Sequence, residues 1–382
     1  MKRALIVASV ASMIDQFNME NIKLLLNLGY KVEVAANFEN PGNMSVQKKE
    51  LLTAKLKQMR VEVHQIDFSR NMKQVKNHLI AYKQLKKVVA NNKIDIIHCH
   101  SPIGGVISRL VGKTNNVKVI YTAHGFHFYK GAPLINWILY YPIEKLLSKF
   151  TDVIVTINKE DYFLCKKKFS NRKTIYIPGI GLDINKIDKL KKSTQKDIRE
   201  EVGFSNSDVI VVSVGELNEN KNHETIIRAI KLLDSKVKYL ICGIGTQKEY
   251  LESLITKLGL SERVLLLGYR TDIVDILCKS DIFAFPSIRE GLGMAALEAM
   301  RCKLPLVTSN SHGINDYSVN GITGFSYKAK DTVGFSNGIK MLSEDSKLRA
   351  SMGSQNFKVV EQYDKEKVNL VMFSIYKECS KE

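Results

Sequence analysis

The most informative segment of the chain is Phe285-Pro286-Ser287-Ile288-Arg289-Glu290-Gly291-Leu292-Gly293-Met294-Ala295-Ala296-Leu297-Glu298-Ala299-Met300. An apolar run ends in Pro-Ser, a loop with one glutamate follows, and glycines lead into a helical pattern. This order predicts one strand–loop–helix unit of a parallel α/β fold, with the loop at the carboxyl end of the strand. The first amides of such a helix have no intrahelical partner, so they can face an anionic or hydroxyl-rich ligand.

The same alternation of short β-branched runs and helical patterns extends in both directions from this segment, which indicates parallel sheets. In the first half of the chain we predict strands at 4–8, 32–35, 61–66, 94–99, 118–122, 153–157 and 174–177. The predicted helices of this half include 18–28, 75–91 and 134–149. A second series of strands is predicted at 209–214, 239–242, 264–267, 282–285 and 306–308, with helices such as 223–233 and 248–257.

The boundary between the two series falls near Pro178-Gly179-Ile180-Gly181, where proline and glycines punctuate a strand end. A chain of 382 residues is long enough for two domains. We expect a Rossmann-like domain over residues 1–180, a second over residues 181–364, and a last helix, 365–382, that crosses back to the first. Ligands bind beyond the carboxyl ends of parallel strands, so we expect the two domains to face each other across a cleft.

Positive charge is concentrated in the first half. The whole chain has 57 Lys and Arg, 39 Asp and Glu, and a net charge of +18. Residues 1–180 contain 28 basic and 12 acidic side chains, a balance of +16, which leaves +2 for residues 181–382. Such one-sided charge fits an anionic partner, which could be nucleic acid, an acidic membrane or a phosphorylated substrate. A solvated basic surface without a partner is the alternative.

The cysteines and the apolar runs indicate the cellular compartment in which we expect the protein. The six cysteines are scattered without a CxxC pair, which argues against a zinc site or a disulfide framework and fits a reducing cytoplasm. The first residues lack the long apolar region and the cleavage site of a signal peptide, and we predict a first β-strand there. No apolar run reaches the ~18 residues of a membrane span. We therefore expect a cytoplasmic protein that is soluble or peripheral to the membrane.

The two glutamates of the segment suit a polyol ligand, because carboxylates accept hydrogen bonds from paired sugar hydroxyls. The segment resembles the GT-B glycosyltransferases of family 4, which share a Pro-Ser strand end and a Glu-x7-Glu element, matched here by Glu290 and Glu298. The similarity extends over nearly the whole chain. It implies that Glu290 lies by the donor sugar, that Glu298 accepts from the ribose hydroxyls, and that Gly291, Leu292 and Gly293 contact the donor.

Within the family, the sequence looks closest to bacterial enzymes of capsule and exopolysaccharide assembly. This narrower match is carried by residues 98–105, 122–128, 215–223 and 68–71. It implies a retaining, metal-independent enzyme that needs no cofactor. The donor would be a nucleotide diphosphate sugar, preferably a UDP-sugar. The acceptor would be a saccharide on a lipid diphosphate, reached from the inner face of an anionic cell membrane.

Lys221 lies in a loop after a predicted strand, where a lysine can neutralise a diphosphate and help the nucleotide to leave. The family usually places an arginine after the glycine that matches Gly215, whereas this chain has Glu216 there. Lys221 is therefore the candidate for stabilising the leaving group, and Glu216 could either orient Lys221 or contact the donor. Arg270 is a second candidate donor-binding cation.

Histidines mark the same edge of the first predicted sheet. His124 follows a strand, and the resemblance implies that it contacts the donor sugar and phosphate across the cleft, with Gly125 and His127 on the acceptor side. His98 and His100 are two apart on a strand and share a face, so they could form a metal pair. No third ligand with suitable spacing is visible and the fold class generally works without a metal. We therefore expect no metal and place His100 on the acceptor side.

For the remaining candidates on the acceptor side, the sequence allows more than one role. The first βα loop, predicted at residues 8–13, has small side chains but not the glycines that the family often has there, and Ser12 is its candidate. Arg70 could bind an acceptor diphosphate with its fork of donors, or it could be a surface residue. The apolar and aromatic segment 133–141 around Trp137 predicts a buried helix, a membrane-inserting helix, or both roles together.

Parts of the sequence also fit other functions. Residues 291–296 fit the GxGxxA fingerprint, but the next predicted strand ends in 309–311 without the acid that a dinucleotide site needs, which excludes nicotinamide chemistry. A sugar-nucleotide epimerase with the same two-domain cleft is the enzymatic alternative. A nucleic-acid-binding protein is suggested by charge alone, and the chain lacks an aromatic-interleaved basic stripe or a recognised module.

Overall fold

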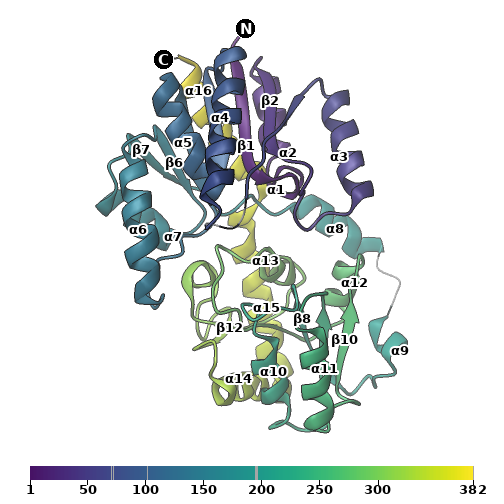
Figure 1. The fold of residues 1–382 in the computed structure, drawn as a ribbon. Helices are drawn as coiled ribbons and strands as arrows, with labels where there is room; N and C mark the ends of the chain where they lie inside the picture. Colours follow the sequence, from purple (N-terminus) through teal and green to yellow (C-terminus); the bar gives the residue numbers. More distant parts are fainter. Residues whose placement is uncertain (70, 72, 101, 194–196, 382) are drawn as a thin grey trace. The chain divides into compact units, whose positions relative to one another are not determined.

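The computed structural model describes residues 1–69, 71, 73–100, 102–193 and 197–381 (Figure 1). Arg70, a predicted acceptor-side residue, lies outside the described residues. The chain divides into two compact units, one formed by Met1–Ile180 with Glu366–Glu382, the other by Gly181–Lys365. Among the described helices, none combines the length and the apolar character that crossing a bilayer requires.

The N-terminal unit is built on a seven-stranded parallel sheet with the order β3-β2-β1-β4-β5-β6-β7. The central strand is buried from Ala4 to Val10, as expected for a parallel strand covered on both faces. The strands are β1 (Arg3–Val10), β2 (Lys31–Asn37), β3 (Glu62–Gln65), β4 (Ile96–His100), β5 (Lys118–Ala123), β6 (Val153–Thr156) and β7 (Lys173–Tyr176).

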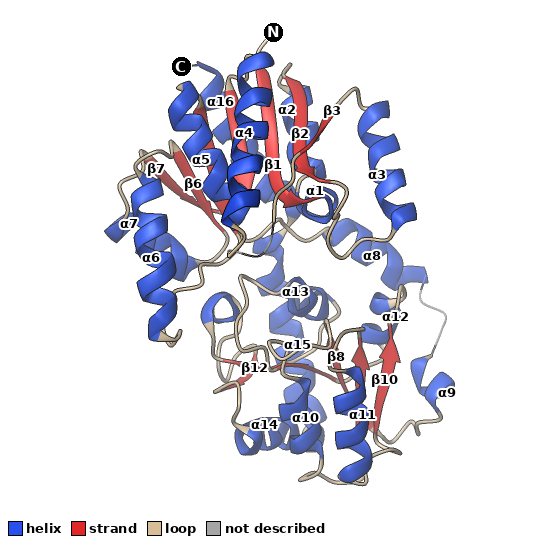
Figure 2. Ribbon diagram, in the orientation of Figure 1, coloured by secondary structure: helices blue, strands red, loops and turns tan. Residues whose placement is uncertain are grey.

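Helices cover both faces of this sheet (Figure 2). Successive residues of a strand point to opposite faces, so Cys99 of β4 joins the core formed with α4 and α5, whereas His98 bonds Tyr376 of α16 on the other face. The helices are α1 (Ala11–Phe17), α2 (Met19–Asn27), α3 (Val46–Gln58), α4 (Val75–Asn91), α5 (Ile103–Asn115), α6 (Leu134–Ser148), α7 (Lys159–Lys168) and α16 (Lys365–Lys381).

The C-terminal unit has a six-stranded parallel sheet with the order β10-β9-β8-β11-β12-β13. Its strands are β8 (Val209–Val214), β9 (Val237–Cys242), β10 (Val264–Gly268), β11 (Ile282–Phe285), β12 (Leu306–Ser309) and β13 (Gly324–Tyr327). Its α-helices are α8 (Ile184–Ser193), α9 (Ile198–Val202), α10 (His223–Ile230), α11 (Lys248–Lys257), α12 (Ile273–Cys278), α13 (Met294–Arg301), α14 (Thr332–Glu344) and α15 (Ser346–Val359). The 3-10 helices are η1 (His312–Asp316) and η2 (Val360–Tyr363). Two parallel-sheet, Rossmann-like domains confirm the predicted fold class.

The predicted first βα loop was wrong. β1 continues to Val10, which keeps an extended backbone with φ −140°, and α1 begins at the next residue, Ala11. Ser12 therefore lies in the first turn of a helix, where it is buried and its amide donates to the Pro41 carbonyl at 2.9 Å. The small side chains that suggested a loop serve instead to bring α1 directly against the end of the central strand.

Candidate active site

The C-terminal unit places two candidate loops where its strand order reverses. β9 and β10 extend from β8 on one side, and β11, β12 and β13 extend on the other. The loops after β8 and β11 therefore flank the switch point, which is where open parallel sheets bind ligands. They hold the predicted donor-site residues Gly215, Glu216, Lys221, Glu290, Gly291, Leu292 and Gly293.

Two asparagines join these loops. The Asn220 carbonyl accepts from the Ile288 amide at 2.8 Å, and the Asn220 side chain donates to the Arg289 carbonyl at 2.9 Å. Asn222 donates to the Pro286 carbonyl at 3.1 Å and adopts a left-handed backbone with φ 54°, which asparagine tolerates better than most residues. The residue between the two asparagines, Lys221, is thereby fixed at the junction of both loops.

Lys221 forms an ion pair with Glu290 across the junction. Its Nζ lies 2.5 Å from Glu290 Oε1, and the two side chains are 21% and 13% exposed. The lysine stem runs over Gly215, where a Cβ would come within 3.2 Å of its Cδ and Cε. Its ammonium lies 5.0 Å from the centre of the Phe285 ring. The carboxylate that orients Lys221 is therefore that of Glu290, whereas the side chain of Glu216 is exposed.

The helix α13 begins directly behind this pair. Gly293 is its N-cap, with φ 95°, and a Cβ there would come within 2.6 Å of the Phe285 ring and 2.8 Å of the Tyr317 hydroxyl. Only glycine fits this left-handed and crowded position. The first amides of α13 have no intrahelical partner, and the helix dipole adds partial positive charge at this end. The site therefore combines a lysine with a helix N-terminus, which suits an anionic ligand.

The 3-10 helix η1 backs the Glu290 loop. The Gly313 amide donates to the Glu290 carbonyl at 3.1 Å. A Cβ at Gly313 would come within 1.9 Å of the Gly291 carbonyl oxygen, so the two backbones pack closely. The Leu292 side chain is buried. The buried side chain of Leu292 thus anchors the loop. Only the backbone of Leu292 can contact a ligand there.

Glu298 lies farther along α13 and is partly buried. Burial raises its pKa above the usual range, and the positive charge of Lys186 on α8 opposes that rise. The helix α8 is tied to α13 because the Arg301 Nε donates to Asp188 at 2.9 Å. A half-buried carboxylate of this kind is positioned to accept hydrogen bonds from a bound polyol.

Arg270 is not grouped with Lys221 by the structure. It follows β10, the edge strand that lies two positions from β8. Its guanidinium donates to Glu201 at 2.5 and 2.9 Å and to Asp272 at 2.8 and 2.6 Å. Its charge is thus balanced by two carboxylates, whereas Lys221 lies at the junction of the loops after β8 and β11.

Three histidines lie near the carboxyl ends of β4 and β5 in the N-terminal unit. His98 bonds Tyr376 through Nδ1 at 2.7 Å and Thr122 through Nε2 at 2.8 Å. His100 Nδ1 lies 2.9 Å from His124 Nε2. Both ring nitrogens of His98 are thus engaged in hydrogen bonds, so the structure offers no free nitrogen on this ring for a metal shared with His100.

These imidazoles are neutral at physiological pH. Burial lowers the pKa of His124 to about 4 and that of His98 to about 3, and it holds the pKa of His100 well below the usual range. The His100–His124 contact is therefore a hydrogen bond between two neutral rings, in which one N–H donates to the lone pair of the other. The Nε2 atom of His100 is buried without a partner in the described part of the chain.

The loop after His124 is held by an acidic residue of α7. Gly125 adopts φ 105°, and the next amide, that of Phe126, donates to Asp161 Oδ2 at 3.0 Å. The His127 ring stacks on Tyr140 of α6 with centroids 4.8 Å apart. The structure therefore brings His100, His124, Gly125 and His127 to one edge of the N-terminal sheet.

Known proteins match this chain over nearly all of its length. Residues 9–158 match the family model Glycosyl transferase 4-like, and residues 194–359 match the model Glycosyl transferases group 1. EpsD of Bacillus subtilis (strain 168), whose name describes a glycosyltransferase, is 35% identical over 98% of this chain and 96% of its own. A protein from Escherichia coli named UDP-Gal:alpha-D-GlcNAc-diphosphoundecaprenol alpha-1,3-galactosyltransferase is 31% identical over 77% of this chain and 76% of its own.

The fold also matches solved structures. Anabaena Alr3699/HepE in complex with UDP and glucose superposes with a TM-score of 0.78 at 18% identity, over 99% of this chain and 100% of the other. At this identity the likeness shows the fold alone. Together with the sequence matches, it confirms the predicted resemblance. The chain belongs to the group 1, family 4 glycosyltransferases and has their GT-B fold.

Proposed function

We propose that this glycosyltransferase takes a sugar from a UDP-sugar with retention of anomeric configuration and transfers it to a saccharide on a lipid diphosphate. The observation that carries the proposal is the Lys221–Glu290 pair at the switch point, in front of the N-terminus of α13. The name of the Escherichia coli relative, with a UDP-sugar donor and a diphosphoundecaprenol acceptor, supports both substrate classes. The Anabaena structure shows only that another protein of this fold binds UDP and glucose.

In this proposal the C-terminal unit holds the donor. The diphosphate binds at the first amides of α13 and draws the Lys221 ammonium from Glu290, because a diphosphate carries more negative charge than one carboxylate. Glu290 is then free to accept from hydroxyls of the donor sugar, and Glu298 accepts from the ribose hydroxyls. Lys221 stabilises the charge that builds on the leaving diphosphate.

The N-terminal unit supplies hydrogen bonds rather than charge. Because burial keeps the pKa of His124 near 4, this residue acts as a neutral donor or acceptor. The acceptor hydroxyl attacks from the face that the diphosphate leaves, and the diphosphate takes its proton. Neither step uses a paired-carboxylate double displacement, for which the sequence gives no sign.

A panel of nucleotide sugars tests this function on the full-length protein. We expect UDP release from one UDP-sugar to depend on an added lipid-diphosphate saccharide. Since the common UDP-hexoses are α-linked, the product should be α-linked too, which NMR of the anomeric proton would measure. A β-linked product would contradict retention. Conversion of the nucleotide sugar without any acceptor would favour an epimerase, and tighter binding of GDP than of UDP would overturn the uridine assignment.

We also propose that the N-terminal unit associates with an anionic membrane. Its charge balance of +16 over residues 1–180 supports this, since each lysine near an acidic bilayer contributes about 1 kcal/mol of attraction. The protein should sediment with acidic liposomes at low salt and dissociate as salt rises, because ions at 0.1 M screen exposed charges within about 10 Å. Replacing the exposed lysines of α4 by glutamine (Lys83, Lys86 and Lys87) should weaken this binding.

The matched control replaces three exposed lysines of the C-terminal unit, Lys340, Lys347 and Lys358, and should leave liposome binding unchanged. Trp137 packs at 5.5 Å from Phe128 and 5.8 Å from Tyr141, between ring centres, so it serves in part as a core residue. We therefore expect its fluorescence to shift little on lipid addition. Equal binding to neutral and acidic liposomes would show that charge does not drive the association.

A further inference from the structure

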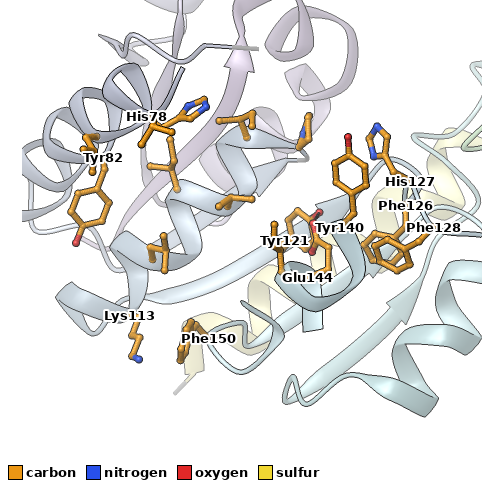
Figure 3. A pocket seen from close by; sticks show the side chains of 18 of the residues that line it. His78, Tyr82, Lys113, Tyr121, Phe126, His127, Phe128, Tyr140, Glu144 and Phe150 are labelled. Carbon is orange, nitrogen blue, oxygen red and sulfur yellow. Dashed lines mark hydrogen bonds between the residues drawn. The ribbon is translucent and has the colours of Figure 1, made fainter. Parts of the chain in front are cut away.

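The N-terminal unit contains a large apolar cavity that the proposed donor chemistry does not use. It has a volume of about 620 Å³, within the roughly 300–1,000 Å³ of small-molecule sites. Its walls come from α4, α5 and α6 and from the loop after β5 (Figure 3). Most of the side chains that line it are aliphatic or aromatic, so the cavity suits a ligand without hydrogen-bonding groups.

The mouth of the cavity is open and apolar. Val75 and Leu79 of α4 are 63% and 57% exposed, and Leu110 of α5 and Ile143 of α6 are 37% and 39% exposed. The apolar surface continues along α6, where four further side chains are more than half exposed: Leu134, Ile135, Ile138 and Leu139. A contiguous exposed apolar surface is typical of a site that contacts a partner, a ligand or a membrane.

The cavity runs to the acceptor-side loop. Gly125, Phe126 and His127 line one end of it, where His127 stacks on Tyr140 (Figure 3). Charge inside the wall is balanced, because Glu144 accepts from the buried Arg109 at 2.7 Å and from the Tyr121 hydroxyl at 3.0 Å. An apolar ligand in the cavity therefore meets no unbalanced charge from this pair, and Lys113, the cation that also lines the cavity, lies over the Phe150 ring at 3.8 Å. The end of the ligand would lie beside the loop that carries the acceptor-side candidates.

We infer that this cavity binds the hydrocarbon chain of the lipid diphosphate that carries the acceptor saccharide. This inference rests on the proposed function, which supplies an acceptor with an apolar chain next to an anionic headgroup. The cavity matches that pattern for two reasons. It is an apolar space within a unit whose charge balance is +16 over residues 1–180, and one end of it lies at the acceptor-side loop. Seating the chain there would hold the diphosphate and its sugar in register beside His124 and His127.

Calorimetry with farnesyl diphosphate and inorganic diphosphate tests the site on the full-length protein. Both probes carry the diphosphate, and only the first carries a hydrocarbon chain. We expect farnesyl diphosphate to bind at least about tenfold more tightly, since apolar burial adds roughly 25 cal/mol per Å². Val106→Trp, which fills the cavity, and the mouth variant Leu79→Gln/Leu110→Gln should each remove most of this advantage.

The matched control is Val46→Gln/Leu51→Gln, because these α3 side chains are 63% and 71% exposed and do not line the cavity. It should bind farnesyl diphosphate as the unmodified chain does. Equal affinity for the two probes, or cavity variants that bind like the control, would overturn the inference. Displacement of the farnesyl probe by an equal concentration of dihexanoyl phosphatidylglycerol would also overturn the inference, because the cavity would then be a site for bulk membrane lipid.

Two further measurements separate this inference from the proposed function. UDP binding should be the same in the cavity variants and in the unmodified chain, because it tests only the C-terminal unit. Sugar transfer to an acceptor on a short, water-soluble chain should also be unchanged in these variants, while transfer to a long-chain acceptor falls about tenfold. If the cavity variants transfer sugar to the long-chain and the short-chain acceptor as fast as the unmodified chain does, the glycosyltransferase function stands and the cavity has no part in it.

Discussion

Lys221→Met should lower the rate of sugar transfer by about 10²–10³-fold, the loss seen when one preorganised donor to a developing charge is removed. The structure strengthens this expectation, because Lys221 is fixed between two loop-bridging asparagines and lies 2.5 Å from Glu290 in front of α13. Glu216 occupies the position of the family's usual arginine, so that second cation is missing. The rate is measured as UDP release per enzyme at saturating donor and acceptor.

Two controls give this result its meaning. Lys279→Met removes another lysine of the C-terminal unit that forms an ion pair, at 3.2 Å from Asp197, and should leave the rate unchanged. Glu298→Ala should instead weaken UDP binding in calorimetry, because its proposed role is to hold the ribose. If Lys221→Met costs less than about tenfold, another cation such as Arg289 stabilises the leaving group.

The regular elements could be predicted because their patterns are local. The helix Val75–Asn91 and the strand Val209–Val214 have the predicted bounds, since an amphipathic period and a β-branched run each carry their own signal. The edge strand β13 (Gly324–Tyr327) was missed because it begins at a glycine, a residue that is depleted in strands. The helix α8 (Ile184–Ser193) was also not among the predicted helices. This helix is rich in lysine and buries only a few apolar side chains, among them Ile184 and Ile187, so few apolar positions mark its helical period.

The site residues could be named from the sequence, but their partners could not. Lys221 and Glu290 are 69 positions apart, and nothing local predicts that their side chains form an ion pair. The sequence suggested the neighbouring Glu216 as the partner, whereas the sheet topology brings the loops after β8 and β11 together. Asn220 and Asn222 were also missed, although an asparagine-rich run between a strand and a helix is a sign of loop bridging.

The cavity is a second feature that only the fold reveals. The apolar segment around Trp137 left a buried helix and a membrane-facing helix as alternatives. The structure shows one buried and one exposed apolar face on α6, because Trp137 packs on Phe128 while Leu134 and Ile138 are 74% and 59% exposed. A helical period alone does not show which apolar face meets the sheet and which meets solvent, since both faces of this helix are apolar.

The wall of this cavity should also be decisive for stability, which Glu144→Ala tests. Arg109 is fully buried, and Glu144 is the carboxylate that accepts from it, at 2.7 Å. Burial of Arg109 opposes its charged form, and Glu144, together with Tyr121 and Cys99, more than offsets this and raises the pKa of the guanidinium. Removing one partner of a buried ion pair leaves the other charge uncompensated and costs about 3–5 kcal/mol. Urea unfolding followed by tryptophan fluorescence measures the loss, because Trp137 lies on the same helix as Glu144.

Two comparisons separate the buried charge from the change in size. Glu378→Ala breaks an ion pair with Lys173 in the same unit whose side chains are 55% and 45% exposed, and should cost less than about 1 kcal/mol. The double variant Arg109→Met/Glu144→Leu removes both charges and keeps apolar volume, so it should recover most of the stability that Glu144→Ala loses. If the double variant is as unstable as the single one, the geometry of the hydrogen bonds with Tyr121 and Gly105, rather than the unpaired charge of Arg109, stabilises this wall.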